Sequence, residues 1–244
     1  MSLEKAREVL RVEAAAIEAL AGQIDENFLR AVDLILRSTG RVIVTGMGKT
    51  GIIGRKIAAT LSSTGTPSIF LHSAEAVHGD LGQVTRADVV IVISTSGETE
   101  ETTRLLPLLK KIGCPAIALT GNPRSSLARH SEVVLNVAVS EEGCPLGLAP
   151  MPSTTATLAM GDALAACLIV RRGFRREDFA FYHPGGALGR RLLLTVGDIM
   201  RQGEGFPRVG AGQPVREVLL AITRARCGSA CVVDARGGLL GIFT

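Results

Sequence analysis

Five short apolar segments, separated by stretches with helical spacing, constrain the fold of this chain more than any other feature. The segments are rich in valine and isoleucine and most are apolar throughout, which is typical of parallel strands covered on both faces. Segments 52–63 and 100–111 between them have the spacing of helices. This alternation predicts a three-layer α/β fold with a five-stranded parallel sheet. The predicted strands are 41–45, 68–71, 88–94, 115–120 and 132–138.

Composition agrees with a globular protein. Of the 244 residues, 46% are hydrophobic and 20% are charged, which is enough apolar material for a full domain and a remainder. Two helices are predicted before the sheet, at 2–21 and 25–38, and an alanine-rich helix follows it at 153–171. No segment reaches the roughly 18 uninterrupted apolar residues of a membrane span, so we expect no membrane partner.

Charge and cysteine usage narrow the class of protein. The net charge of +4 suits a small anionic ligand. The sequence has no dense Lys/Arg stripe interleaved with aromatics, so we expect no nucleic-acid partner. The chain has five scattered cysteines and a charged N-terminal segment unlike a signal peptide. Both features predict reduced thiols and a cytoplasmic location.

The first loop of interest follows the strand at 41–45. Gly46, Gly48 and Gly51 match the GxGxxG dinucleotide pattern, but the acid that this pattern requires at the end of the next strand is missing. A nucleoside triphosphate loop fails too, because its first glycine would fall at Ile43. The glycines still allow close approach of a ligand, and the helix that follows favours an anion.

The second loop follows the strand at 88–94 and reads STSGET. It places four hydroxyls and a glycine at a strand-to-helix turn. Hydroxyls and helix N–H groups can surround a phosphate monoester without a metal. Simple capping of the helix needs only one such residue, so the loop predicts phosphate binding through Ser94, Thr95, Ser96 and Thr99.

These motifs together resemble a sugar isomerase (SIS) domain. GMGKTG, STSGET, HGDLG (78–82), MGDALA (160–165), HPGGALGRRLL (183–193) and the run from Glu142 to Pro150 carry the resemblance. More narrowly, the chain is similar to the D-arabinose 5-phosphate isomerases over about residues 1–200. That resemblance implies interconversion of D-arabinose 5-phosphate and D-ribulose 5-phosphate, feeding Kdo, lipopolysaccharide or capsule synthesis. It also implies a homotetramer.

The reaction expected from the resemblance moves a proton between adjacent carbons through an enediol. It needs a base, a group that stabilises the developing oxyanion, and help in opening the sugar ring. It requires no cofactor. The resemblance carries catalytic roles onto Lys49, Glu101, Glu142 and His183. For Glu101, a plain helix-dipole role is a rival, and the nearby Glu98 and Glu100 are easily confused with it.

Further residues are expected to bind the substrate. The turn Glu75–Gly79 matches an ExxHG pattern of sugar-phosphate isomerases, which places His78 at the sugar. Gly65 and Thr66 match a substrate-contacting position of the family. His72 is a candidate, with His183, for an adventitious or inhibitory zinc ion. The remaining predicted substrate contacts are Gly48, Thr50, Ser153 and Thr154.

The domain organisation is predicted as 1–195 for the SIS domain and 196–244 for a second module. The second segment resembles the first part of a CBS module, of which family members usually carry two in tandem. Here the run ends at GIFT, so the module is interpreted as incomplete. This leaves ligand regulation through CBS modules open.

Two alternatives to the isomerase remain. One is a sugar-phosphate sensor, which needs the binding loop but not the acid–base set. Such regulators usually carry a DNA-binding head, and the N-terminal helices here lack a basic helix-turn-helix signal. The other alternative is an isomerase for a different phosphosugar.

Overall fold

The computed structural model describes residues 2–244, apart from the side chains at 187, 188, 193 and 204. It divides into two compact units, Met1–His183 and Pro184–Thr244, and each is described by itself. The boundary lies before the one predicted at 195/196, since residues 184–195, including helix α10 (Ala187–Leu193), group with the second unit.

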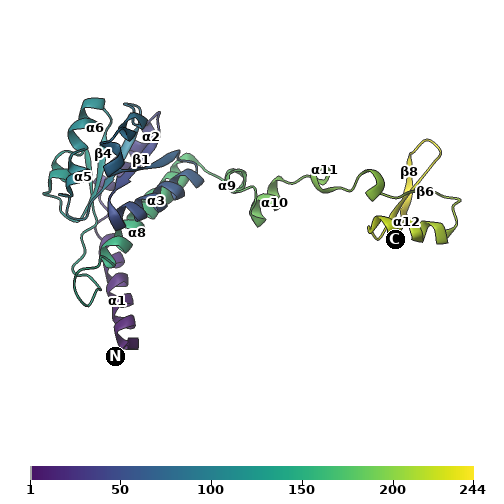
Figure 1. Ribbon diagram of the computed structural model, residues 1–244, viewed down its shortest axis with the longest axis horizontal. Helices are drawn as coiled ribbons and strands as arrows, with labels where there is room; N and C mark the ends of the chain where they lie inside the picture. The colour runs from purple at the N-terminus through teal and green to yellow at the C-terminus, as the bar shows by residue number, and fades with distance from the viewer. Residues whose placement is uncertain (1) are drawn as a thin grey trace. The chain divides into compact units, whose positions relative to one another are not determined.

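The first unit is built on a five-stranded sheet in the order β2-β1-β3-β4-β5, in which every pair is parallel (Figure 1). All residues of β1, β3 and β4 are buried, as expected for the largely apolar central strands of a parallel sheet covered on both faces. The strands are β1 (Val42–Gly46), β2 (Ser68–His72), β3 (Val89–Ile93), β4 (Ala116–Thr120) and β5 (Val133–Asn136).

Helices cover both faces of this sheet. Val42 and Val44 of β1 point to a core shared with α2 (Glu26–Arg37), α3 (Gly48–Ser63) and α8 (Pro152–Arg172). Ile43, between them, points to the opposite core, because successive side chains of a strand alternate. The predicted three-layer α/β fold with a five-stranded parallel sheet is therefore confirmed. The opposite face carries α4 (Ser73–Ala76), η1 (Asp80–Gln83), α5 (Glu100–Thr103), α6 (Leu106–Ile112) and α7 (Ser126–Arg129).

The predicted helix at 100–111 is two helices in the structure. The chain leaves α5 after Thr103 and enters α6 at Leu106, with Pro107 in the first turn. Proline lacks an N–H and fits only the first turn of a helix. The proline explains why the sequence periodicity predicts one helix where the backbone forms two.

Helix α8 is the central helix of its layer, and α1 (Ser2–Ala21) packs against it. By length and composition α8 could cross a membrane. Its buried side chains, however, belong to the core, among them Ala156, Met160 and Leu164. A core helix of a globular unit passes the same test, and the absence of a membrane partner stays a prediction.

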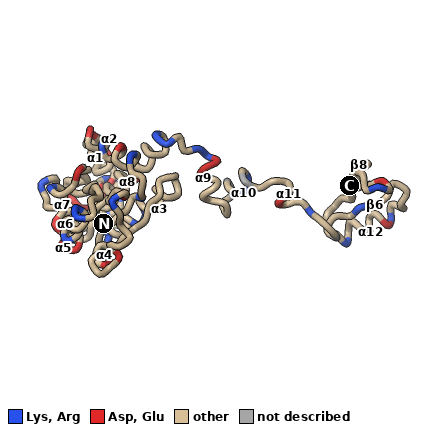
Figure 2. Tube along the Cα trace, turned by 90° about the horizontal axis from the view of Figure 1, so that it is seen from above, with Lys and Arg blue, Asp and Glu red and all other residues tan. Residues whose placement is uncertain are grey.

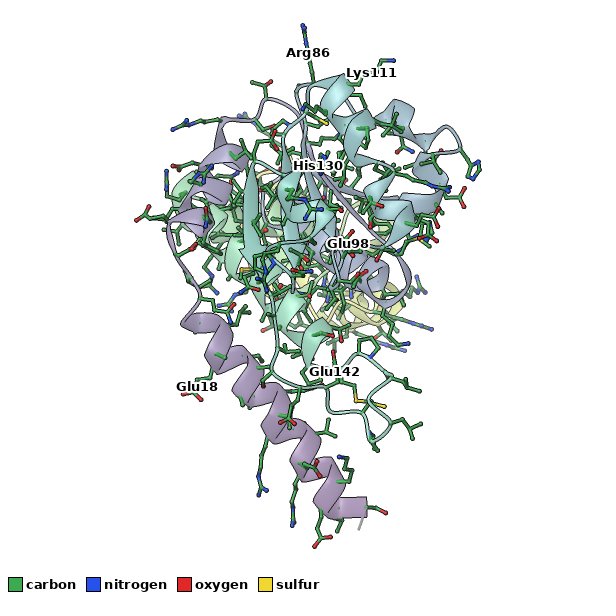
Figure 3. The ribbon with its side chains drawn as sticks, turned by 90° about the vertical axis from the view of Figure 1, so that its left-hand side faces the viewer. Glu18, Arg86, Glu98, Lys111, His130 and Glu142 are labelled. Carbon is green, nitrogen blue, oxygen red and sulfur yellow. The ribbon has the colours of Figure 1, made fainter. Side chains whose placement is uncertain are left out.

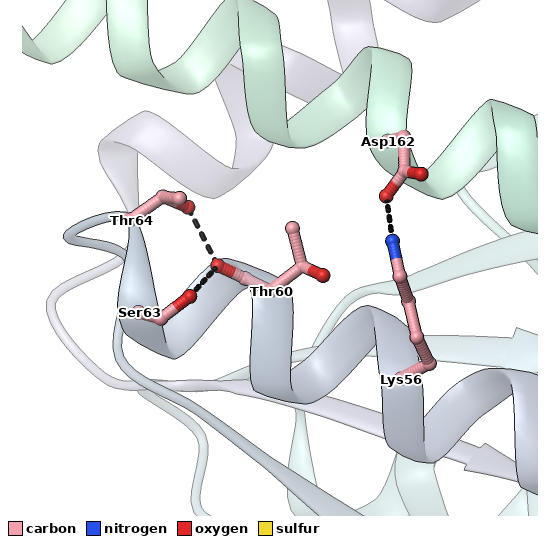
Figure 4. A network of polar contacts seen from close by, with 5 residues as sticks. All are labelled: Lys56, Thr60, Ser63, Thr64 and Asp162. Carbon is pink, nitrogen blue, oxygen red and sulfur yellow. Dashed lines mark hydrogen bonds and ion pairs between the residues drawn. The ribbon is translucent and has the colours of Figure 1, made fainter. Parts of the chain in front are cut away.

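Close packing of α3 on α8 depends on a glycine. A Cβ atom at Gly161 would lie 2.5 Å from the Ile57 side chain. At the rim of this contact Lys56 pairs with Asp162, while Ser63 and Thr64 donate to the Thr60 carbonyl (Figure 4). The Gly161–Ile57 approach and the Lys56–Asp162 pair join α3 to α8, whereas the Ser63 and Thr64 bonds lie within α3 and its C-cap.

Gly161→Val is expected to lower the free energy of unfolding by about 1–3 kcal/mol, the usual cost of overpacking. Urea denaturation, followed through the unfolding transition of the first unit, measures this change in free energy. Ala166→Val, at an exposed position of the same helix, is the matched control and should change stability little. Equal stability of the two variants would show that α3 and α8 have room to separate.

The second unit contains a small three-stranded sheet. Strand β6 (Arg208–Gly210) pairs parallel with β7 (Ala230–Val233), and β7 pairs antiparallel with β8 (Leu239–Phe243). Val209, Val218 and Ala230 form the small core beneath α12. The interpretation of 196–244 as part of a CBS module stays a prediction. The elements after α8 are α9 (Arg176–Tyr182) in the first unit, then α11 (Val196–Ile199), η2 (Gly203–Gly205), β6 (Arg208–Gly210), α12 (Val215–Ala225), β7 (Ala230–Val233) and β8 (Leu239–Phe243).

Candidate active site

The carboxyl ends of β1 and β3 form the point at which the sheet topology changes direction. After β1 the chain enters α3 on one face of the sheet, and after β3 it enters α5 and α6 on the other. Because the two connections diverge, a crevice opens between them, which is the usual ligand position in open α/β sheets.

A cavity of about 600 Å³ lies at this crevice. Three segments line it: the loop that opens α3, the STSGET loop, and the segment that leads into α8. Most of the predicted site residues of these segments face it. The lining residues are Met47, Gly48, Lys49, Thr50, Thr95, Ser96, Thr99, Glu101, Glu142, Leu148, Pro150 and Ser153.

The STSGET loop is held by its own hydrogen bonds. Ser94 is 2% exposed, and its hydroxyl accepts the Gly97 N–H and shares a hydrogen bond with the Thr99 hydroxyl. Ser94 is not among the lining residues, whereas Thr95, Ser96 and Thr99 are. Ser94 thus supports the loop from its buried side, whereas Thr95, Ser96 and Thr99 face the cavity.

Gly97 lets this loop lie close to the start of α7. Its φ is +70°, and a Cβ atom there would lie 2.0 Å from the Ser125 hydroxyl. Both the left-handed backbone and the lack of space require glycine. The loop therefore has a fixed shape before any ligand binds.

The three neighbouring glutamates of this loop and helix have different partners. Glu98 accepts a hydrogen bond from the Ser126 N–H at 2.7 Å, and this bond lowers the pKa of its carboxyl. Glu100 pairs with Arg104. Glu101 alone of the three lines the cavity. Geometry thus separates the residues that were easily confused in the sequence.

Glu142 reaches the cavity from the segment before α8. Its Oε2 accepts a hydrogen bond from the Met151 N–H at 2.7 Å, which closes the intervening loop. Figure 3 shows Glu142 at the end of the first unit opposite Arg86, in the loop that enters β3, and Lys111, in the last turn of α6 before β4. The carboxylate therefore lies at the edge where the strands end.

Lys49 is an exposed residue of the first turn of α3 and faces the same cavity. A cation at a helix N-terminus opposes the helix dipole and is unfavourable for stability. No ion pair of Lys49 is found among residues 2–244. Acidic and basic residues are otherwise interspersed over the first unit (Figure 2). Lys49 is therefore better explained by a ligand than by stability.

Two predicted residues, Gly65 and Thr66, lie at the edge of the sheet where the strands begin, opposite the edge that carries the cavity. They precede β2, and the Thr66 hydroxyl accepts a hydrogen bond from Arg172 Nε, at the C-terminal end of α8. Ser153, at the other end of α8, lines the cavity. A rise of about 1.5 Å per residue separates the two ends by roughly 28 Å.

His183 lies beyond that distant end of α8, at the C-cap of α9. Its ring stacks on Phe179 with centroids 3.9 Å apart, and its Nδ1 is 2.9 Å from the Phe179 carbonyl oxygen. Within one chain, the structure does not bring His183 to the cavity that Lys49, Glu101 and Glu142 line.

The other two predicted histidines and Thr154 also lie outside the cavity lining. His72 ends β2, and its Nδ1 is buried without a hydrogen-bond partner among the described residues. His78 is exposed after α4. The Thr154 hydroxyl donates to the Met151 carbonyl at 2.8 Å. The described residues include no cluster of three or more potential metal ligands, and the zinc interpretation stays a prediction.

Sequence reasoning missed three lining residues, Met47, Leu148 and Pro150. Leu148 is an apolar side chain that is 81% exposed, in the segment whose motif is quoted above. Its signal is an apolar residue within a run of proline and glycine, which alone does not separate a lining residue from a surface one.

The five cysteines within the described chain are free thiols.

Comparisons with known proteins agree with this geometry. The SIS domain family model matches residues 35–167. Arabinose 5-phosphate isomerase KdsD of Pseudomonas aeruginosa is 52% identical over 242 residues, covering 99% of this chain and 74% of the relative. KdsD of Escherichia coli K12 is 53% identical over 238 residues, covering 98% of this chain and 73% of the relative.

A solved structure agrees as well. A protein of Escherichia coli CFT073 in complex with arabinose 5-phosphate superposes with a TM-score of 0.73 and 43% identity, covering 75% of this chain and 97% of that one. The chain thus matches about three quarters of the length of the curated relatives and nearly all of this solved relative. This chain belongs to the SIS-domain family and, within it, to the arabinose 5-phosphate isomerases.

Proposed function

We propose that this protein is an aldose–ketose isomerase that interconverts D-arabinose 5-phosphate and D-ribulose 5-phosphate. The observation that carries the proposal is a single cavity that Lys49, Glu101 and Glu142 line beside the hydroxyls of the STSGET loop. A sensor needs the phosphate loop but has no use for a cation and two carboxylates that converge on the sugar. The names of the relatives favour the same reaction.

The phosphate is proposed to bind at Thr95, Ser96 and Thr99. Hydroxyls donate hydrogen bonds to phosphate oxygens, and the N-terminal turn of α3, with Lys49, adds positive potential to the same cavity. The carboxylates lie among the other lining residues. A phosphate on the hydroxyl side directs the sugar carbons toward Glu142.

The reaction then needs only proton transfers. A base removes the proton bound to C2 of the open aldose, the electron pair forms a C1–C2 double bond, and the carbonyl electrons move to O1. Protonation of O1 gives the enediol. Loss of the O2 proton and protonation of C1 give the ketose. Glu142 and Glu101 are the candidate bases in the cavity, and Lys49 is suited to stabilise charge on oxygen.

The residues at the other sheet edge are proposed to act in a second copy of the chain. Thr66 contacts Arg172, which lies about 28 Å from Ser153 along α8 by its helical rise, and Gly65 and His183 lie toward the same end of α8. These residues are therefore proposed to complete a neighbour's site. Helix α1 supports self-association, since Leu3, Leu10 and Ile17 are 73%, 66% and 42% exposed at a seven-residue spacing. A homotetramer, as the family resemblance implies, is the proposed assembly.

Four further features are proposed from the sequence and the family resemblance: the location, the cofactor requirement, the role of zinc and the role of His78. We place the protein in the cytoplasm, as its reduced thiols indicate. We propose that it requires no cofactor and that zinc at His72 is inhibitory. His78 is proposed to assist ring opening.

Incubation with a panel of aldose phosphates tests the proposal. We expect ketose formation with arabinose 5-phosphate at a higher kcat/KM than with other pentose or hexose phosphates. Binding without turnover of any member would support the sensor instead. A higher kcat/KM for another sugar would support an isomerase of that phosphosugar.

Ser96→Ala is expected to raise KM roughly 10- to 100-fold, the effect of losing one hydrogen bond to a charged group, with kcat little changed. Ser96 is exposed, and its hydroxyl accepts one hydrogen bond, from the exposed Glu98 N–H at 3.2 Å, which water can replace in the variant. Ser131→Ala, whose hydroxyl bonds the Leu127 carbonyl away from the cavity, is the control. An unchanged KM would remove Ser96 from the phosphate site.

A further inference from the structure

Ser153 has a buried hydroxyl that nothing in the described protein satisfies. The residue is 1% exposed, and its Oγ has no hydrogen-bond partner among the described residues. It lines the cavity that contains Lys49 and Glu142. Buried hydroxyls are almost always paired, because leaving one unpaired is costly. Such an exception at a cavity wall points to a partner that arrives with the ligand.

Helix capping does not account for this serine. The N-cap of α8 is Met151, and Pro152 is the first helical residue. Ser153 therefore lies inside the first turn, where a hydroxyl has no cap position to fill. Its neighbour Thr154 differs, because its hydroxyl and its N–H both donate to the Met151 carbonyl.

The helix adds its own positive potential at this point. Helix α8 has 21 residues, and the first N–H groups of a long helix lack intrahelical acceptors. The Met151 N–H is taken by Glu142, and Pro152 has none. The Ser153 N–H and hydroxyl are thus the first donors of this terminus that remain for a ligand in the cavity.

The position of Glu142 decides which part of a sugar phosphate these donors would meet. Its carboxylate is bonded to the residue two positions before Ser153. A carboxylate there repels a phosphate dianion. A carboxylate close to hydrogen-bond donors is, however, the arrangement that an enediol reaction needs. The carboxylate acts as the base beside the carbon, and the donor lies beside the adjacent oxygen.

We propose that the Ser153 hydroxyl, with the N-terminus of α8, binds the reacting oxygen of the sugar and stabilises the negative charge that develops on it. The assignment rests on the proposed isomerase function and deepens it. As Glu142 takes the proton from C2 and the electrons move to O1, the hydroxyl donates a hydrogen bond to O1. The phosphate stays with the STSGET loop, which lines the same cavity.

Ser153→Ala in the full-length protein tests this assignment. We expect kcat to fall about 100- to 1,000-fold, the range for loss of an oxyanion donor. KM and the inhibition constant of inorganic phosphate should stay within about twofold of the original values, because the STSGET loop is intact. The melting temperature of the free protein should not fall, because the alanine variant loses an unsatisfied buried group.

Thr157→Val is the matched control. It removes a buried hydroxyl one turn deeper in α8, which donates to the Ser153 carbonyl and does not line the cavity. Its kcat should stay within about twofold of the unsubstituted protein. Ser153→Cys, with a weaker donor of similar size, should fall between serine and alanine in kcat.

Each other outcome contradicts the assignment. An unchanged kcat with a lower melting temperature would make Ser153 a structural residue. A large rise in the phosphate inhibition constant would place Ser153 in the phosphate site. If the unsubstituted protein isomerises no sugar phosphate, the proposed function and the assignment both fall. If it does isomerise and Ser153→Ala is equally active, only the assignment falls.

Discussion

Glu142→Gln is expected to lower kcat by a factor on the order of 10²–10⁴, the range for removing a general acid or base. The amide keeps nearly the same shape, and its oxygen can still accept the Met151 N–H that Glu142 now accepts. The loop should therefore keep its conformation while the ability to take a proton is lost. Steady-state kinetics with arabinose 5-phosphate measure the effect.

The neighbouring Glu141→Gln is the control for this substitution. Glu141 is exposed and does not line the cavity, so its kcat should stay within about twofold. Inhibition by inorganic phosphate should be the same in both variants, because the STSGET loop is untouched. A Glu142→Gln variant with near-normal kcat would mean that another group, of which Glu101 is the nearest candidate, takes the proton.

His183→Ala is expected to lower kcat by a similar factor of about 10²–10⁴, although His183 lies far from its own chain's cavity. His130→Ala is a close control. The Nδ1 atoms of His130 and His183 lie 2.8 and 2.9 Å from the carbonyl oxygen four residues earlier. Both substitutions thus remove this Nδ1 contact, and the one at 183 also removes the ring stacking on Phe179. Only the substitution at 183 should affect turnover, and the melting temperatures of both variants show whether the lost stacking alters stability.

Mixing the Glu142→Gln and His183→Ala variants separates a shared site from a loss of folding. If each site takes Glu142 from one chain and His183 from another, subunit exchange creates some sites with both original residues. Part of the activity should then return. No recovery after demonstrated exchange, for example by mass spectrometry of tagged subunits, would contradict a site shared in this way.

The sheet could be predicted from the sequence because its signal is local. Largely apolar runs predict β1, β3 and β4 almost to the residue. The loops that open α3 and follow β3 were identifiable too, since parallel strands bring their carboxyl ends to one edge. The prediction of a single helix at 100–111 was less accurate, because the apolar spacing continues across the break before Pro107.

The candidate site needed the three-dimensional structure where the outcome depends on partners. Ser94 and Ser96 carry the same hydroxyl in one motif, yet Ser94 is buried beneath the loop and Ser96 faces the cavity. Glu98, Glu100 and Glu101 differ only through Ser126 and Arg104, which are not part of the motif. Periodicity and spacing carry no information about such pairings.

The separation of the predicted set into two groups was also invisible in the sequence. Gly65, Thr66 and His183 match motifs as well as Lys49 does, but α8 carries the chain from one sheet edge to the other between Ser153 and Arg172. A motif identifies a residue and not the chain that supplies it. The separation therefore supports a proposed assembly in which sites are shared.

A crystal structure of the Glu142→Gln variant with arabinose 5-phosphate would show where the phosphate and the reacting carbons bind, because slow turnover preserves the bound sugar. We expect the phosphate in contact with Thr95, Ser96 and Thr99. We also expect C1 and C2 within roughly 3 Å, the reach of a hydrogen bond, of the side chains at 142 and 153. A sugar phosphate bound outside this cavity, or with its phosphate against residues 142 and 153, would contradict this expectation.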